Sequence, residues 1–129
     1  DAGMTEQGLR ELGFSDLDLV FLENVGNLVC PAEFDTGAVK NVAILSVPEG
    51  HDKPLKYPLM FRVCDALVIN KTDLLPYFDF DMRRVEEYAR MRNPDIRIFP
   101  VSAKTGEGVS LFAEWLRHEV EAFIRPCTN

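Results

Sequence analysis

The stretch Ala66-Leu67-Val68-Ile69-Asn70-Lys71-Thr72-Asp73 decides the fold. Its first four residues are apolar and its last four are polar. An apolar run of this length that stops in a polar turn is typical of a parallel strand feeding a loop. Open α/β sheets bind their ligands at the carboxyl ends of such strands. The stretch therefore predicts an α/β domain with a ligand site at residues 70–73.

Asp73 suggests which ligand this loop binds. A carboxylate can accept two hydrogen bonds side by side, and guanine offers that pair of donors in N1–H and N2–H₂, whereas adenine does not. A well-made bidentate pair gives about 1–3 kcal/mol of base discrimination, and leaving a buried partner unpaired widens the margin. The stem of Lys71 can lie along the base while its ammonium stays in water. Taken alone, the loop fits an ordinary solvated turn equally well, and residues 70–72 also match a glycosylation sequon.

A second polar loop, Ser102-Ala103-Lys104-Thr105-Gly106, favours guanine recognition. It follows another apolar run, residues 96–101, and a predicted helix separates the two loops. Two strand-end loops of these types resemble the paired guanine-recognition motifs of the GTPase superfamily. The resemblance implies that the backbone N–H of Ala103 reaches O6 of the base while Asp73 binds its N–H edge.

The composition is that of an ordinary globular domain and argues against several functions. The chain has 129 residues, 47% of them apolar and 27% charged. A net charge of −7 and a pI of about 4.8 argue against nucleic acid or an acidic membrane surface as a main partner. No apolar run approaches the roughly 18 residues of a membrane span. The cysteines Cys30, Cys64 and Cys127 are odd in number and widely spaced, which predicts a cytoplasmic protein without a disulfide framework.

Apolar spacing along the rest of the chain predicts alternating helices and strands. The predicted strands are residues 17–22, 41–47, 66–69 and 96–101, and the predicted helices are residues 4–12, 59–63, 79 or 81 to about 93, and 109–124. The last helix carries a wide apolar stripe, namely Phe112, Trp115, Leu116, Val120 and Phe123. Such alternation predicts an α/β fold, a three-layer, mostly parallel sheet flanked by helices.

Glu23 and Gly26 suit the phosphate side of a nucleotide site. Glu23 directly follows the predicted strand 17–22, and at the carboxyl end of a strand it can hold Mg²⁺ through water. Gly26 can bring a bare backbone N–H to a terminal phosphate. The alternative is a capped turn in which glycine and asparagine only tolerate unusual dihedrals. The guanine loops favour the phosphate interpretation.

The thirteen residues from Glu23, Glu-Asn-Val-Gly-Asn-Leu-Val-Cys-Pro-Ala-Glu-Phe-Asp, resemble the switch of the hydrogenase nickel-insertion GTPases, the HypB family. The stretch from Pro48 to Pro58 and the two guanine loops are similar to that family in order and spacing. Membership implies a P-loop NTPase fold of the SIMIBI type, with GTP or GDP and Mg²⁺ as cofactors. It also implies a homodimer that forms or tightens with GTP. The implied function is GTP-dependent delivery of nickel to the large subunit of [NiFe]-hydrogenase, together with other maturation proteins, and the residues leave open whether the metal carried is Ni²⁺ or Zn²⁺.

The resemblance also implies roles for single residues. Glu23 is the Mg²⁺-side carboxylate, Gly26 senses the γ-phosphate, and Cys30 is a metal ligand. The residues implied to recognise the base lie in the two loops, namely Asn70, Lys71 and Asp73 in the first and Ser102, Ala103 and Lys104 in the second. A thiolate seven residues after the Mg²⁺-linked carboxylate can couple metal affinity to nucleotide state. Without the flanking motif, a single cysteine is usually a small buried hydrophobe.

No Gly-x-x-x-x-Gly-Lys-Ser/Thr pattern, which cradles nucleotide phosphates, occurs in these residues. In the family this loop, its strand and a Cys-His pair of the metal site lie N-terminal to the first residue here. We therefore expect residues 1–129 to be the C-terminal part of a single GTPase domain from a longer protein. The missing strand would leave the strands at residues 17–22 and 41–47 with unpaired edges.

Two other functions stay open at this point. One is a non-catalytic metal-holding or interaction module of the same fold that has lost its phosphate site. The other is a related accessory GTPase of the urease or cobalamin-enzyme type, against which residues 27–31 argue. Among the remaining residues, His51 and His118 are expected at the surface, the latter paired with Glu114, and Cys64 is expected to be packed.

Overall fold

Three parallel strands form the centre of the molecule. The computed structural model describes residues 2–13, 16–23 and 37–124. In this part of the chain the sheet has the order β1-β2-β3, with β1 at Val42–Ser46, β2 at Ala66–Asn70 and β3 at Arg97–Pro100. Because all pairings are parallel, the carboxyl ends of the three strands lie at one edge of the sheet.

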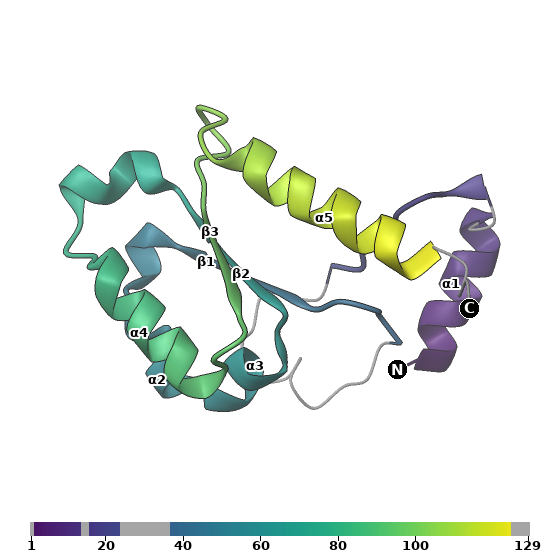
Figure 1. Cartoon of the computed structure of the whole chain (residues 1–129), viewed down its shortest axis with the longest axis horizontal. Coiled ribbons are helices and arrows are strands. Elements are labelled where there is room, and N and C mark those ends of the chain that lie inside the picture. Colours follow the sequence, from purple (N-terminus) through teal and green to yellow (C-terminus); the bar gives the residue numbers. More distant parts are fainter. Residues whose placement is uncertain (1, 14–15, 24–36, 125–129) are drawn as a thin grey trace.

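Helices cover both faces of this sheet (Figure 1). On one face lie α2 (Lys53–Lys56), α3 (Pro58–Val63) and α4 (Met82–Arg92), and on the other lies α5 (Val109–Ile124). Two short 3-10 helices, η3 (Val47–Glu49) and η4 (Thr72–Tyr77), follow β1 and β2. The N-terminal helix α1 (Ala2–Leu12) ends at Gly13, whose φ is +69°. The predicted three-layer α/β fold is confirmed.

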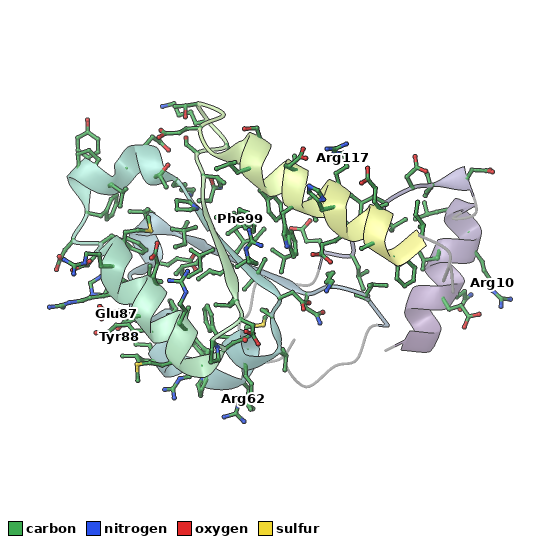
Figure 2. All side chains as sticks on the ribbon, in the orientation of Figure 1. Arg10, Arg62, Glu87, Tyr88, Phe99 and Arg117 are labelled. Atoms are coloured by element: carbon green, nitrogen blue, oxygen red, sulfur yellow. The ribbon has the colours of Figure 1, made fainter. Side chains whose placement is uncertain are left out.

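Side chains of the strands alternate between two apolar clusters. Leu67 and Ile69 pack on the α3 and α4 side, whereas Ala66 and Val68 pack on the α5 side. On the α5 side the predicted core residue Trp115 is buried, and its ring centroid lies 5.6 Å from that of Phe99. Figure 2 shows Phe99 between the sheet and α5. This packing fixes the ends of β2 and β3 relative to each other.

The start of α4 confirms the predicted cap at Asp81 and corrects the surface position predicted for His51. Asp81 caps the helix, because its Oδ1 accepts hydrogen bonds from the backbone N–H groups of Arg83 at 3.0 Å and Arg84 at 3.3 Å. His51 was expected on the surface but is half-buried. Its Nδ1 accepts the N–H of Asp81 at 3.1 Å, and its ring packs edge-on against Phe80. The histidine therefore joins the loop after η3 to α4.

The predicted strand over residues 17–22 is wrong for this chain. The segment lies outside the sheet, and its apolar side chains are exposed, with Phe21 at 68%. A strand forms only where a neighbour pairs with its backbone. In the described part of the chain, β1 pairs with β2 and no strand pairs with residues 17–22. An apolar run therefore did not suffice to make a strand.

Phe123 also departs from the prediction, because it is 68% exposed rather than part of a buried stripe. The cause is a mismatch of lengths. A helix of the size of α5 is about 24 Å long, whereas a five-residue strand spans about 16 Å. Phe112, Trp115 and Leu116 pack against the sheet, and the last turn of α5 extends beyond it. None of the described helices combines the length and apolarity needed to cross a bilayer.

Candidate functional site

The loop after β2 makes a tight turn at Lys71. Lys71 has φ +64° and ψ +39°, in the left-handed region that non-glycine residues rarely adopt. The turn is held by two backbone hydrogen bonds, from Thr72 N–H to the carbonyl of Val101 at 3.2 Å and from Leu74 N–H to the carbonyl of Lys71 at 2.9 Å. It directs the half-buried side chain of Asp73 back toward the end of β3.

The two predicted loops meet at this edge of the sheet. The Oγ of Ser102 donates a hydrogen bond to Oδ1 of Asp73 at 2.9 Å. The backbone N–H of Ala103 donates to Oδ1 of Asn70 at 3.0 Å. Four of the residues predicted to bind the base are therefore joined in pairs across the two loops. This follows from topology, because β2 and β3 are parallel neighbours and their carboxyl ends coincide.

Hydrogen bonds within the second loop hold Ser102 in place. Its Oγ accepts from Thr105 N–H at 3.2 Å, its carbonyl accepts from Gly106 N–H at 2.7 Å, and its own N–H donates to the carbonyl of Glu107 at 2.9 Å. Ser102 is fully buried, whereas Ala103 and Lys104 are exposed. The loop is thus a closed turn with an anchored serine and an accessible outer side.

This arrangement suits a planar ligand with adjacent donors. The carboxylate of Asp73 has one oxygen oriented by a neutral hydroxyl and keeps further lone pairs for hydrogen-bond donors. The exposed Lys71 and Lys104 flank the same edge of the sheet. A carboxylate acceptor beside a backbone N–H donor is the complement of one edge of guanine, whose N1–H, N2–H₂ and O6 lie in a row.

A family model described as CobW/HypB/UreG, nucleotide-binding domain, matches residues 2–100. The chain belongs to this family. Within it, the chain is 51% identical over 125 residues to hydrogenase maturation factor HypB of Azotobacter chroococcum mcd 1, covering 97% of this chain and 41% of the relative. The chain thus spans about two fifths of the length of that relative. The resemblance to HypB proteins predicted from the sequence is confirmed.

Solved HypB structures share the fold of this CobW/HypB/UreG domain. HypB from Archaeoglobus fulgidus superposes with a TM-score of 0.86 at 40% identity, covering 93% of this chain and 58% of that one. HypB from Helicobacter pylori, solved in complex with nickel, gives a TM-score of 0.87 at 36% identity and covers 99% of this chain and 61% of that one. The P-loop NTPase fold expected from the resemblance is therefore shown by these neighbours.

The predicted phosphate and metal residues are not brought together by the described part of the structure. Glu23 is exposed at the end of the segment 16–23. Gly26 and Cys30 lie outside the described residues. Within the described ranges, no group of three or more histidine, cysteine or acidic side chains could hold a metal ion. The roles of Glu23, Gly26 and Cys30 therefore stay predictions.

Two residues of the second loop escaped the sequence analysis as functional candidates. Thr105 closes the loop, because its N–H reaches Ser102 and its Oγ1 accepts from Glu107 N–H at 3.2 Å. Gly108 has φ +77° and touches the backbone of β3. The spacing Gly106-Glu107-Gly108 is the signal that could have drawn attention to Gly108, whereas no pattern in the sequence singles out Thr105. Cys64 is buried as predicted, and His118 pairs with Glu114 as predicted, at 3.4 Å.

Proposed function

We propose that this chain supplies the guanine-recognition part of a GTP-binding and GTP-hydrolysing metallochaperone that helps insert nickel into [NiFe]-hydrogenase. The observation that carries the proposal is the pair of hydrogen bonds that joins Asp73 to Ser102 and Asn70 to Ala103. The names of the HypB relatives and the nickel complex of the Helicobacter pylori neighbour support the biological context.

In the proposed complex, Asp73 accepts hydrogen bonds from N1–H and N2–H₂ of the base. Hydrogen bonds to a charged acceptor contribute about 1.5–3 kcal/mol each, and adenine offers neither donor in that arrangement. The Ala103 amide donates to O6, so its present bond to Oδ1 of Asn70 is exchanged or shared. Lys71 and Lys104 cover the faces of the base with their stems while their ammonium groups stay in water.

The proposal for the phosphate and metal side rests on the family. Glu23 would hold Mg²⁺ through water and Gly26 would contact the terminal phosphate, in a domain completed by a phosphate loop that these 129 residues do not contain. Hydrolysis would then control a metal site that includes Cys30, with Ni²⁺ or Zn²⁺ as cargo. We place this activity in a cytoplasmic homodimer that tightens with GTP and acts with the hydrogenase large subunit and other maturation proteins.

Base selectivity tests the nucleotide part of the proposal. Titration of the ¹⁵N-labelled chain with GMP and AMP, followed by NMR, should show amide shifts at residues 70–73 and 102–106 and tighter binding of GMP. Asp73→Ala should abolish the preference, whereas Asp79→Ala, an exposed carboxylate in the following loop, should leave it intact. Equal affinities for GMP and AMP in the unaltered chain would refute guanine recognition.

Nickel binding tests the metal part separately. Equilibrium dialysis with Ni²⁺ should show weaker binding by Cys30→Ala than by the unaltered chain, because a soft thiolate is lost. The matched control is Cys64→Ala, which removes a thiol that is buried in the core. Equal nickel affinity of the unaltered chain and Cys30→Ala would remove Cys30 from the site without affecting the guanine proposal.

A further inference from the structure

Gly108 lies where the second loop returns to α5, and its backbone rests on the end of β3. A Cβ at this position would lie 2.1 Å from the carbonyl oxygen of Pro100, 3.2 Å from its carbonyl carbon and 3.3 Å from Cα of Val101. All three atoms belong to the backbone, which cannot rotate out of the way as a side chain can. Only a residue without a side chain fits between the loop and the strand.

Gly106 provides a contrast within the same loop. Its φ of +85° is similar to the +77° of Gly108, but a Cβ at Gly106 would meet no atom within 4 Å. Alanine at either position has the same unfavourable left-handed backbone. The close approach to β3 is therefore a property of Gly108 that Gly106 does not share.

The position of Gly108 is transmitted to Asp73 through a short chain of contacts. The neighbouring Glu107 accepts a hydrogen bond from Ser102 N–H at 2.9 Å, and the Oγ of Ser102 donates to Oδ1 of Asp73 at 2.9 Å. If Gly108 moves away from Pro100, Glu107 moves with it, and Ser102 loses one of the three hydrogen bonds that hold it in the loop. The carboxylate of Asp73 is then no longer held in one orientation.

We propose that Gly108 is a positioning residue for guanine specificity, because its missing side chain lets the loop 102–107 approach β3 closely enough for Ser102 to orient Asp73. This inference rests on the proposed function. It predicts an effect on selectivity as well as on affinity. Hypoxanthine shares O6 and N1–H with guanine but lacks the 2-amino group, so the preference for GMP over IMP reports how well Asp73 is placed for that group.

The test compares Gly108→Ala with Gly13→Ala by NMR titration with GMP, IMP and AMP. Gly13 lies outside the two loops, its φ is also positive at +69°, and a Cβ there would meet no atom within 4 Å. One hydrogen bond to a charged acceptor discriminates by roughly tenfold or more, so the unaltered chain and Gly13→Ala should prefer GMP over IMP by that factor. In Gly108→Ala the ratio should fall below about twofold, and the amides of Ala103 and Thr105 should exchange faster with solvent. General destabilisation would lower both affinities by the same factor and leave the ratio unchanged.

A second variant covers the case in which Gly108→Ala does not fold. One extra glycine inserted between Glu107 and Gly108 removes the close approach without a clash, and lengthening an exposed loop costs little stability. It should lose the GMP preference as Gly108→Ala does. A wild-type ratio in either folded variant would overturn the role of Gly108. A missing preference for GMP over AMP in the unaltered chain would instead overturn the proposed function itself.

Discussion

Replacing Asp73 by asparagine should change the preferred base from guanine to xanthine, which carries an oxygen at C2 where guanine carries an amino group. Asparagine offers one acceptor, Oδ1, and one donor group, Nδ2. The structure decides which of them faces the base. The Oγ of Ser102 already accepts from Thr105 N–H at 3.2 Å and donates to residue 73 at 2.9 Å. It therefore selects the asparagine oxygen and leaves Nδ2 directed at the ligand.

The expected magnitudes follow from the hydrogen bonds that change. Guanine loses a hydrogen bond to a charged acceptor, which contributes about 1.5–3 kcal/mol. Its 2-amino group instead faces Nδ2 of the asparagine, which is also a donor. GMP binding should therefore weaken by roughly 10- to 150-fold. Xanthine gains a neutral hydrogen bond of about 0.5–1.5 kcal/mol, so XMP binding should tighten by roughly 2- to 10-fold.

NMR titration of Asp73→Asn with GMP and XMP measures both changes in one sample series. Asp79→Asn makes the same substitution at an exposed residue outside the two loops and should change neither affinity. In the double variant Asp73→Asn with Ser102→Ala, the amide is free to flip and the preference for XMP should disappear. A folded Asp73→Asn chain that still prefers GMP over XMP would show that residue 73 does not contact the 2-position of the base.

Three further predictions concern stability and reactivity. Ser102→Ala should lower the free energy of unfolding in urea melts by about 2–3 kcal/mol, because it removes a buried hydroxyl bound to a carboxylate. The control Ser110→Ala, at the exposed start of α5, should change the free energy of unfolding by less than about 0.5 kcal/mol. Equal losses in the two variants would contradict the role of Ser102 as a buried link between the two loops. Because Lys71 has φ +64°, the free energy of unfolding of Lys71→Gly should exceed that of Lys71→Ala by about 1 kcal/mol. At the exposed Arg90 in α4 the order should be reversed, with Arg90→Ala more stable than Arg90→Gly. The same order at both positions would contradict the left-handed turn at Lys71. Burial, assisted by the nearby charge of Asp65, raises the pKa of the Cys64 thiol to about 12. Iodoacetamide at pH 8 should therefore label Cys64 only after unfolding, and mass spectrometry showing rapid labelling of the native chain would be the contrary result.

Elements whose ends are determined by neighbouring residues could be predicted from the sequence. The cap at Asp81 and the apolar spacing of residues 109–124 predicted α4 and α5 close to their observed bounds. The segment 17–22 could not be predicted in this way, because a strand depends on a hydrogen-bonded partner that is often distant in the sequence. The predicted burial of Phe123 was wrong for a related reason. Helical spacing identifies the apolar face of α5 but not the width of the sheet beneath it.

For the candidate site, the sequence predicted the two loops and their meeting but not how they are joined. The strand-end rule brings residues 70–73 and 102–106 to one edge of the sheet for any sequence with this topology. The individual bonds depend on the parallel register of β2 and β3 and on the left-handed turn at Lys71. The contact of Gly108 with Pro100 depends on how closely the loop approaches the strand, which no residue pattern specifies.

The hydrogen bonds present in the structure also rank the contributions to base discrimination. The amide of Ala103, proposed to bind O6, already donates to Oδ1 of Asn70 at 3.0 Å, so a bound base exchanges one hydrogen bond for another. Asp73 is different, because Ser102 orients its carboxylate without occupying all of its lone pairs. A hydrogen bond that replaces another bond within the protein adds little affinity, whereas a bond from the base to a charged acceptor contributes about 1.5–3 kcal/mol net of the water that it displaces. The preference for guanine should therefore come mainly from Asp73, and the O6 contact should serve chiefly to align the base.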